Sequence, residues 1–147
     1  SARRLRVLSM LETLKEIPTR EGKYFVFAHF VIPHPPYSFG ADGEWLEINA
    51  NTASYDEIKN AYLNQVEYIS GEILEVVDAI QAGSDAVIII QGDHGPPPDL
   101  TNDPAIKMPI LNAYYLPGAE LPLLEDRSYF APNQDHERIG LIPNTCP

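Results

Sequence analysis

A long helical pattern between two short apolar runs limits the fold of this 147-residue chain more than any other feature. Over residues 54–82, apolar side chains recur every three or four positions, which is the spacing of an amphipathic helix. Ser54 and Glu57 have the spacing of a capping box at the start of this helix. One apolar run, residues 23–32, precedes the helix, and another, residues 86–90, follows it. This order predicts two strands joined by a helical crossover.

Both apolar runs have the composition of buried strands. KYFVFAHFVI, residues 23–32, is aromatic and β-branched with no polar alternation until His29, which is typical of a strand covered on both faces. A strand–helix–strand order implies parallel strands and a right-handed crossover. We therefore predict an α/β fold, with a mainly parallel sheet and helices on its faces, in a single domain over residues 1–147.

The rest of the chain is less regular. Leucines recur every three positions over residues 2–16, which predicts a first amphipathic helix. Residues 33–53 are predicted to be a loop, and a loop this long in a compact domain is often functional. Residues 108–118 are predicted to be a third strand, and residues 119–147 an irregular proline-rich tail.

Composition excludes some classes of protein. A hydrophobic fraction of 44% is typical of a globular chain. The formal net charge of −11 argues against nucleic acid as a partner, because binding to phosphates needs clustered Lys and Arg. The single cysteine, Cys146, allows neither an intramolecular disulfide nor a C-x-x-C metal site. The longest apolar run is about half as long as a bilayer span, so we expect this chain to be soluble and without a membrane span.

The segment QGDHGPPP, residues 91–98, places an acid and an imidazole side by side after the apolar run at 86–90. Consecutive side chains on a strand point to opposite faces, so Asp93 and His94 converge only if the backbone turns. Flanking glycines permit such a turn, and an oxygen–nitrogen donor pair suits Zn²⁺ or Mn²⁺. The alternative interpretation is that Asp93 caps a turn and His94 is partly exposed.

Two further histidines surround the start of the long loop. His34 lies between prolines in IPHPPYSF, which would hold its imidazole on a stiff segment suited to an anionic oxygen or a metal. The alternative is an incidental histidine in a proline-rich turn. His29, on the expected first strand, is either a core histidine bonded to a carbonyl or a further site residue.

Three segments in this order, YFVFAHFVIPHPPYSF, YLNQVEYISGEILEVVDAI and AVIIIQGDHG, resemble the sulfatase-like branch of the alkaline phosphatase superfamily. The similarity is greatest to membrane-anchored bacterial sulfatase-like proteins and covers roughly residues 22–118. The resemblance implies a partial alkaline-phosphatase-like domain. It also implies a parent protein that is anchored in a membrane and holds this domain outside the cytoplasm.

The resemblance assigns chemistry to four residues. Asp93 and His94 would ligate a divalent cation (Zn, Mn, Mg or Ca), and His34 would face the anionic group of a sulfate or phosphate ester. His29 is a further catalytic candidate. Such a site would perform hydrolysis or group transfer, because the cation neutralises developing charge and activates a hydroxyl nucleophile.

The nucleophile of that family, a Ser, Thr or Cys upstream of these segments, has no counterpart in residues 1–22. We therefore expect this chain to be the C-terminal portion of a larger domain and to be inactive alone. An uncovered apolar face would also allow a homo-oligomer. The alternative function is a non-catalytic α/β interaction module that binds an envelope partner through the loop aromatics Tyr37, Phe39 and Trp45.

Overall fold

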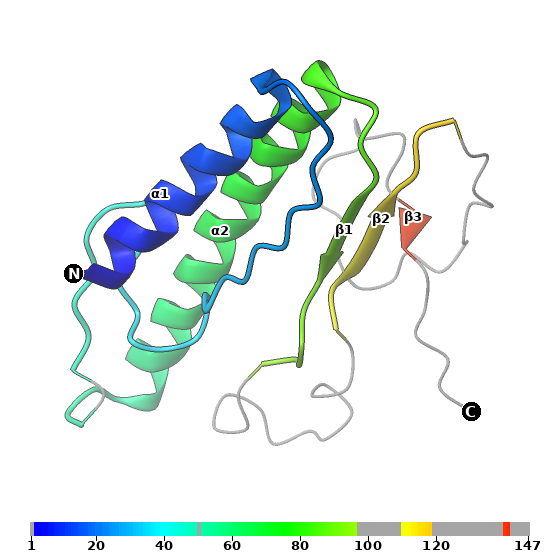
Figure 1. Ribbon diagram of the computed structural model, residues 1–147. Coiled ribbons are helices and arrows are strands. Elements are labelled where there is room, and N and C mark those ends of the chain that lie inside the picture. Colours follow the sequence, from blue (N-terminus) through cyan, green and yellow to red (C-terminus); the bar gives the residue numbers. More distant parts are fainter. Residues whose placement is uncertain (1, 50, 97–109, 119–139, 142–147) are drawn as a thin grey trace. The chain divides into compact units, whose positions relative to one another are not determined.

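The computed structural model describes residues 2–49, 51–96, 110–118 and 140–141 (Figure 1). The elements, in chain order, are α1 (Ala2–Glu16), η1 (Ile17–Thr19), α2 (Tyr55–Gly83), β1 (Ile88–Gln91), β2 (Asn112–Tyr115) and β3 (Gly140–Leu141). The chain divides into two compact units, Ser1–Ser84 and Asp85–Pro147, which are described separately below.

The first unit is built on the helices α1 and α2, which lie side by side (Figure 1). Val7 and Leu11, one turn apart on α1, are buried together with Val76 of α2 and Phe39 of the long loop. Partly buried apolar side chains surround this cluster: Leu8, Leu14, Phe30, Ile32, Tyr68, Ile69, Ile73 and Ile80. The core of this unit therefore lies between the two helices and the loop that connects them.

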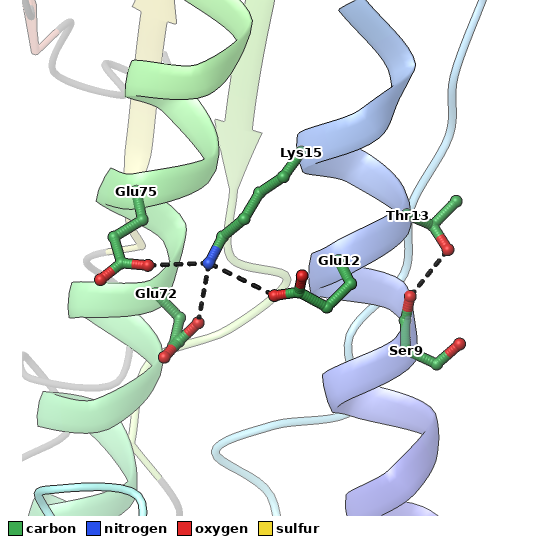
Figure 2. A network of polar contacts seen from close by, with 6 residues as sticks. All are labelled: Ser9, Glu12, Thr13, Lys15, Glu72 and Glu75. Atoms are coloured by element: carbon green, nitrogen blue, oxygen red, sulfur yellow. Dashed lines mark hydrogen bonds and ion pairs between the residues drawn. The ribbon is translucent and has the colours of Figure 1, made fainter. Parts of the chain in front are cut away.

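Lys15 makes the main polar contact between the helices (Figure 2). Its Nζ atom lies 2.7 Å from a carboxylate oxygen of Glu75 and 3.5 Å from one of Glu72, both on α2, and 3.6 Å from Glu12 on its own helix. The hydrogen bond to Glu75 and the other two carboxylates raise the pKa of Lys15. Glu75 and Glu12 are exposed, so water screens their ion pairs with Lys15. These ion pairs therefore contribute little to the stability of the fold.

The two predicted helices are confirmed, almost to the residue. Pro18 follows α1 and lies in η1, and a Cβ atom at Gly83 would be 2.7 Å from the Pro18 side chain, so η1 contacts the end of α2. At the start of α2, the Ser54 side chain accepts a hydrogen bond from the Glu57 amide, while the Glu57 carboxylate accepts one from the Ser54 amide at 2.8 Å. The capping box is therefore formed as the sequence indicates.

We expect Ser54→Ala to lower the free energy of unfolding by about 1 kcal/mol, because alanine lacks the hydroxyl that accepts from the Glu57 amide and donates to the Glu57 carboxylate. Ser70→Ala, at an exposed interior position of the same helix, should instead be neutral or slightly stabilising. Urea unfolding followed by helical circular dichroism measures both. Equal effects of the two substitutions would contradict a specific role for the cap.

The cap also has an expected pH dependence. Hydrogen bonds from Ser54 lower the pKa of Glu57 in the folded protein below its ordinary value. A carboxyl whose pKa is lower in the folded state stabilises the fold above its unfolded pKa, and this contribution is lost as the pH falls through the folded value. The difference in stability between the native chain and Ser54→Ala should therefore shrink on acidification.

The first predicted strand is absent. Residues 23–32 are extended but form neither helix nor strand, and within the described part of the chain no backbone–backbone hydrogen bond joins them to another residue, although the Val31 carbonyl accepts from the Arg3 side chain. Phe25 is 95% exposed, whereas Phe30 and Ile32 pack on the core of the first unit. Hydrophobic composition favours a strand only where a neighbouring strand completes the hydrogen bonds, and composition alone does not identify that neighbour.

The second unit contains a three-stranded sheet with strand order β1–β2–β3, and both pairings are antiparallel. Ile88 pairs with Tyr115, and Ile90 with Ala113. Along β1, half-buried and exposed side chains alternate, as in an antiparallel strand with one covered face. The prediction of an α/β fold with a mainly parallel sheet is therefore wrong, because the crossover it required depended on a strand at residues 23–32.

The predictions for the C-terminal half of the chain are confirmed only in part. The third predicted strand, residues 108–118, is present but shorter, as β2. Of the predicted tail, residues 119–147, the described part is β3. Neither described helix is both long enough and apolar enough to cross a bilayer.

Candidate functional site

Asp93 and His94 lie just beyond the end of β1, where the chain leaves the sheet. The Gly92 amide donates a 2.8 Å hydrogen bond to the Leu111 carbonyl, and the chain then bends over residues 93–96. Because of this bend, the two consecutive side chains approach each other, with Asp93 Oδ1 3.8 Å from His94 Nε2. Their side chains are 85% and 60% exposed, respectively, so both can be reached from solvent.

A backbone carbonyl orients the His94 ring. His94 Nδ1 lies 2.6 Å from the Gly95 carbonyl oxygen, which can only accept, so Nδ1 carries the proton of the neutral ring. The lone pair of Nε2 is then free on the side that faces Asp93. Histidine ligands of metals have this arrangement, with one nitrogen on the metal and the other donating to a carbonyl or carboxylate.

The separation of the two donor atoms also fits a cation. Two ligands at bond lengths of 2.0–2.1 Å on a tetrahedral ion are about 3.4 Å apart, slightly closer than the 3.8 Å between Asp93 Oδ1 and His94 Nε2. Within the described residues, no group of three or more His, Cys, Asp or Glu side chains could hold a metal. The pair thus fits two ligands of a divalent cation, which leaves the other coordination positions to further donors or water.

His34 lies in the first unit, on the loop between α1 and α2, and its side chain is exposed. Its Nδ1 atom is 2.8 Å from the Pro35 carbonyl oxygen, so this ring also carries its neutral proton on Nδ1 and leaves Nε2 free. The peptide bonds before Pro33 and Pro36 are cis. His34 therefore presents one unengaged ring nitrogen from a proline-rich segment.

Two side chains hold the backbone around His34. On one side, Arg3 of α1 donates to the carbonyls of His34, at 2.8 Å, and Pro35, at 2.5 Å. On the other, Gln65 of α2 donates to the Pro33 carbonyl at 3.0 Å and accepts from the Ser38 amide at 2.9 Å. The segment that carries His34 is thus bonded to both helices, although it contains no regular secondary structure itself.

The following turn is fixed by Arg4 and Phe39. Phe39 and Trp45 form an isolated antiparallel bridge, and Arg4 donates to the carbonyls of Ser38 and Gly43 on either side of the turn. The Arg4 guanidinium also lies 4.3 Å from the centre of the Phe39 ring, within the range of a cation–π contact. The long predicted loop is therefore an ordered segment over most of its length.

The four predicted site residues are divided between the two units. Asp93 and His94 are together in the second unit, whereas His29 and His34 are in the first. His29 is exposed on the extended segment, so it is not a core histidine. The loop aromatics Tyr37 and Phe39 are buried, and only Trp45 of the three proposed contact residues is exposed.

Gln65 and Arg3 also hold the His34 segment, although no sequence motif predicted a role for either residue. Gln65 lies one turn from Ala61 and from Tyr68 on α2, so it falls within the stripe that faces the core, and its side chain is 1% exposed. A polar residue inside an apolar helical stripe is the signal that could have identified it. Arg3 has no comparable signal, since an arginine in the first turn of a helix is usually solvated.

Comparison of the chain with models of protein families, with curated proteins and with solved structures found no match. The comparisons therefore assign no family to the chain.

Proposed function

We propose that this chain contributes metal ligands to an enzyme that hydrolyses or transfers sulfate or phosphate esters, with Asp93 and His94 as two of those ligands. The observation that carries the proposal is the convergence of Asp93 Oδ1 and His94 Nε2 to 3.8 Å on an exposed bend after β1.

Each residue has a defined role in this proposal. The Asp93 carboxylate supplies negative charge, and the Gly95 carbonyl keeps the His94 Nε2 lone pair directed outward. A divalent cation held there would neutralise charge on an ester oxygen. His34, when protonated, can donate its Nε2–H to an anionic oxygen. His29 is exposed and stays a candidate proton donor or acceptor.

The wider setting follows from the resemblance. It supports a parent protein that is membrane-anchored and holds this domain outside the cytoplasm. It also supports the expectation that the chain alone has no turnover, because no Ser, Thr or Cys with the surroundings of the family's nucleophile precedes the His-Pro segment. Metal binding is therefore a more direct test of the proposal than catalysis.

Calorimetric titration with Zn²⁺ and with Mn²⁺ should detect binding to the native chain that Asp93→Asn and His94→Gln each weaken by about tenfold or more. The matched control is Asp85→Asn, an exposed carboxylate before β1, which should leave the affinity unchanged.

Two results would contradict the proposal. The first is that neither cation binds to the native chain. The second is that binding persists undiminished in Asp93→Asn/His94→Gln, which would place the cation elsewhere. Either outcome would favour the non-catalytic interaction module.

That second candidate has its own supporting observation. Phe25 and Phe27 are 95% and 82% exposed on an extended segment, and exposed aromatic side chains of this kind favour contact with another protein. The segment at 23–32, rather than the buried Tyr37 and Phe39, would then be the contact surface. A Phe25→Ser/Phe27→Ser variant that loses partner binding but keeps metal binding would separate the two functions.

A further inference from the structure

We infer that Gln65 is a positioning residue for His34: its side-chain amide fixes the segment 33–38 so that the neutral imidazole keeps its proton on Nδ1 and presents a free Nε2. The functional meaning of this inference rests on the role proposed above for His34. The positional claim itself rests on hydrogen bonds that the amide and the ring make.

The amide of Gln65 joins the two ends of the segment. Its Nε2 atom donates to the Pro33 carbonyl at 3.0 Å, and its Oε1 atom accepts from the Ser38 amide at 2.9 Å. The side chain is 1% exposed, so water does not compete for these bonds. An apolar residue here would leave a buried amide and a carbonyl without partners, which opposes the present path of the segment.

Within this fixed segment, the Pro35 carbonyl determines the form of the His34 ring. The carbonyl oxygen lies 2.8 Å from His34 Nδ1 and 2.5 Å from Arg3 Nη1, so it accepts from both. The hydrogen bond at one ring nitrogen decides which nitrogen of a neutral histidine is protonated. A small rotation of the Pro35 peptide would remove this bond and release the ring.

The chemical consequence concerns Nε2. With the proton on Nδ1, the neutral ring offers an Nε2 lone pair to solvent, and the protonated ring adds an Nε2–H that can donate to an anion. An unconstrained neutral histidine in water is mostly protonated on Nε2 instead. Positioning by Gln65 therefore gives His34 a proton-accepting atom that faces outward before any ligand arrives.

Nitrogen-15 NMR of the ring nitrogens tests the inference, since it separates the two neutral forms. In alkaline buffer, in which the imidazole is neutral, we expect the native chain to show His34 mainly as the Nδ1–H form. Gln65→Met should shift His34 to mainly the Nε2–H form. Gln81→Met, at a half-buried glutamine on the same helix, is the matched control and should leave the form of the His34 ring unchanged.

His94 is an internal reference in the same spectra, because its Nδ1 bonds to the Gly95 carbonyl in the other unit and does not depend on Gln65. A change in His94 as well as His34 would indicate general loss of structure and would contradict a positioning role. Persistence of the Nδ1–H form of His34 in Gln65→Met would also overturn the inference.

Gln65→Glu provides a second test that keeps the shape of the side chain, should Gln65→Met lose its helical signal. Burial favours the neutral carboxyl, whose O–H can donate to the Pro33 carbonyl while its other oxygen accepts from the Ser38 amide. We therefore expect Gln65→Glu to keep the Nδ1–H fraction of His34 that Gln65→Met loses, and an equal loss in the two variants would refute the inference. Zn²⁺ titration of Asp93 and His94 does not involve Gln65, so failure of the proposed function is observed independently.

Discussion

Replacement of Phe39 by alanine is expected to lower the free energy of unfolding of the first unit by about 3–5 kcal/mol. Phe39 is 1% exposed and belongs to the buried cluster with Val7, Leu11 and Val76. Its ring stacks on that of Tyr68, with centroids 4.7 Å apart and planes within 13° of parallel. The substitution removes this stacking and leaves a cavity between the helices and the loop.

The Arg4 guanidinium adds to the cost, because it lies 4.3 Å from the centre of the Phe39 ring and would lose that contact. Thermal unfolding followed by helical circular dichroism measures the loss, since α1 and α2 are both in this unit. A fall in Tm of more than about 10 °C is expected.

Phe25→Ala is the matched control for this experiment. It makes the same chemical change at a residue that is 95% exposed, so its expected effect is within about 0.5 kcal/mol of zero. A loss in Phe39→Ala no larger than that in Phe25→Ala would contradict the assignment of Phe39 to the core. A large loss in Phe25→Ala alone would show that residues 23–32 are covered in solution.

The second large effect is expected from Gly43→Ala, which should destabilise the first unit by about 2–4 kcal/mol. Gly43 has φ +77°, in the left-handed region that an alanine adopts only with strain. An added Cβ atom would also lie 2.7 Å from the Tyr68 ring, which is itself held by stacking on Phe39. The ring cannot move away without disturbing the core, so both costs apply.

Gly71→Ala is the control, and it should change the free energy of unfolding in the opposite direction. Gly71 lies in the interior of α2 and is exposed, and apart from its chain neighbours and the backbone of its own helix no described atom lies within 4 Å of the position of an added Cβ. Alanine there should stabilise the unit by about 0.5–1 kcal/mol, because it removes the entropic cost of glycine in a helix. Urea unfolding of both variants should give changes of opposite sign, and changes of the same sign would contradict the local geometry of the turn.

The helices could be predicted from the sequence because their signals are local. The apolar stripe and the Ser54–Glu57 box fix α2, and Pro18 follows α1 closely, so no distant residue is needed to place either element. Residues 23–32 and 86–91 gave equally strong apolar signals, yet only the second contains a strand. A strand depends on its neighbour, and the sequence does not name β2 as the neighbour of β1 or give the pairing its antiparallel direction.

The same limit applies to the candidate site. Asp93 and His94 could be paired from sequence because they are adjacent and flanked by glycines, so a bend suffices to bring them together. The hydrogen bonds that hold the His34 segment could not be predicted from sequence. Arg3 and Gln65 are about thirty positions away from the carbonyls and the amide that they bind. Contacts of that range depend on how the helices pack, which no local pattern reports.

The hydrogen bonds of Arg3 and Arg4 also bear on the order in which the first unit folds. They join residues that are 28 to 40 positions apart, so each one closes a large loop of chain. Closing such loops costs chain entropy before the new contacts compensate for it. The contacts between α1 and α2 close a still larger loop, since Lys15 and Glu75 are 60 positions apart. We therefore expect the segment around His34 to become ordered together with the packing of the two helices and not from local structure.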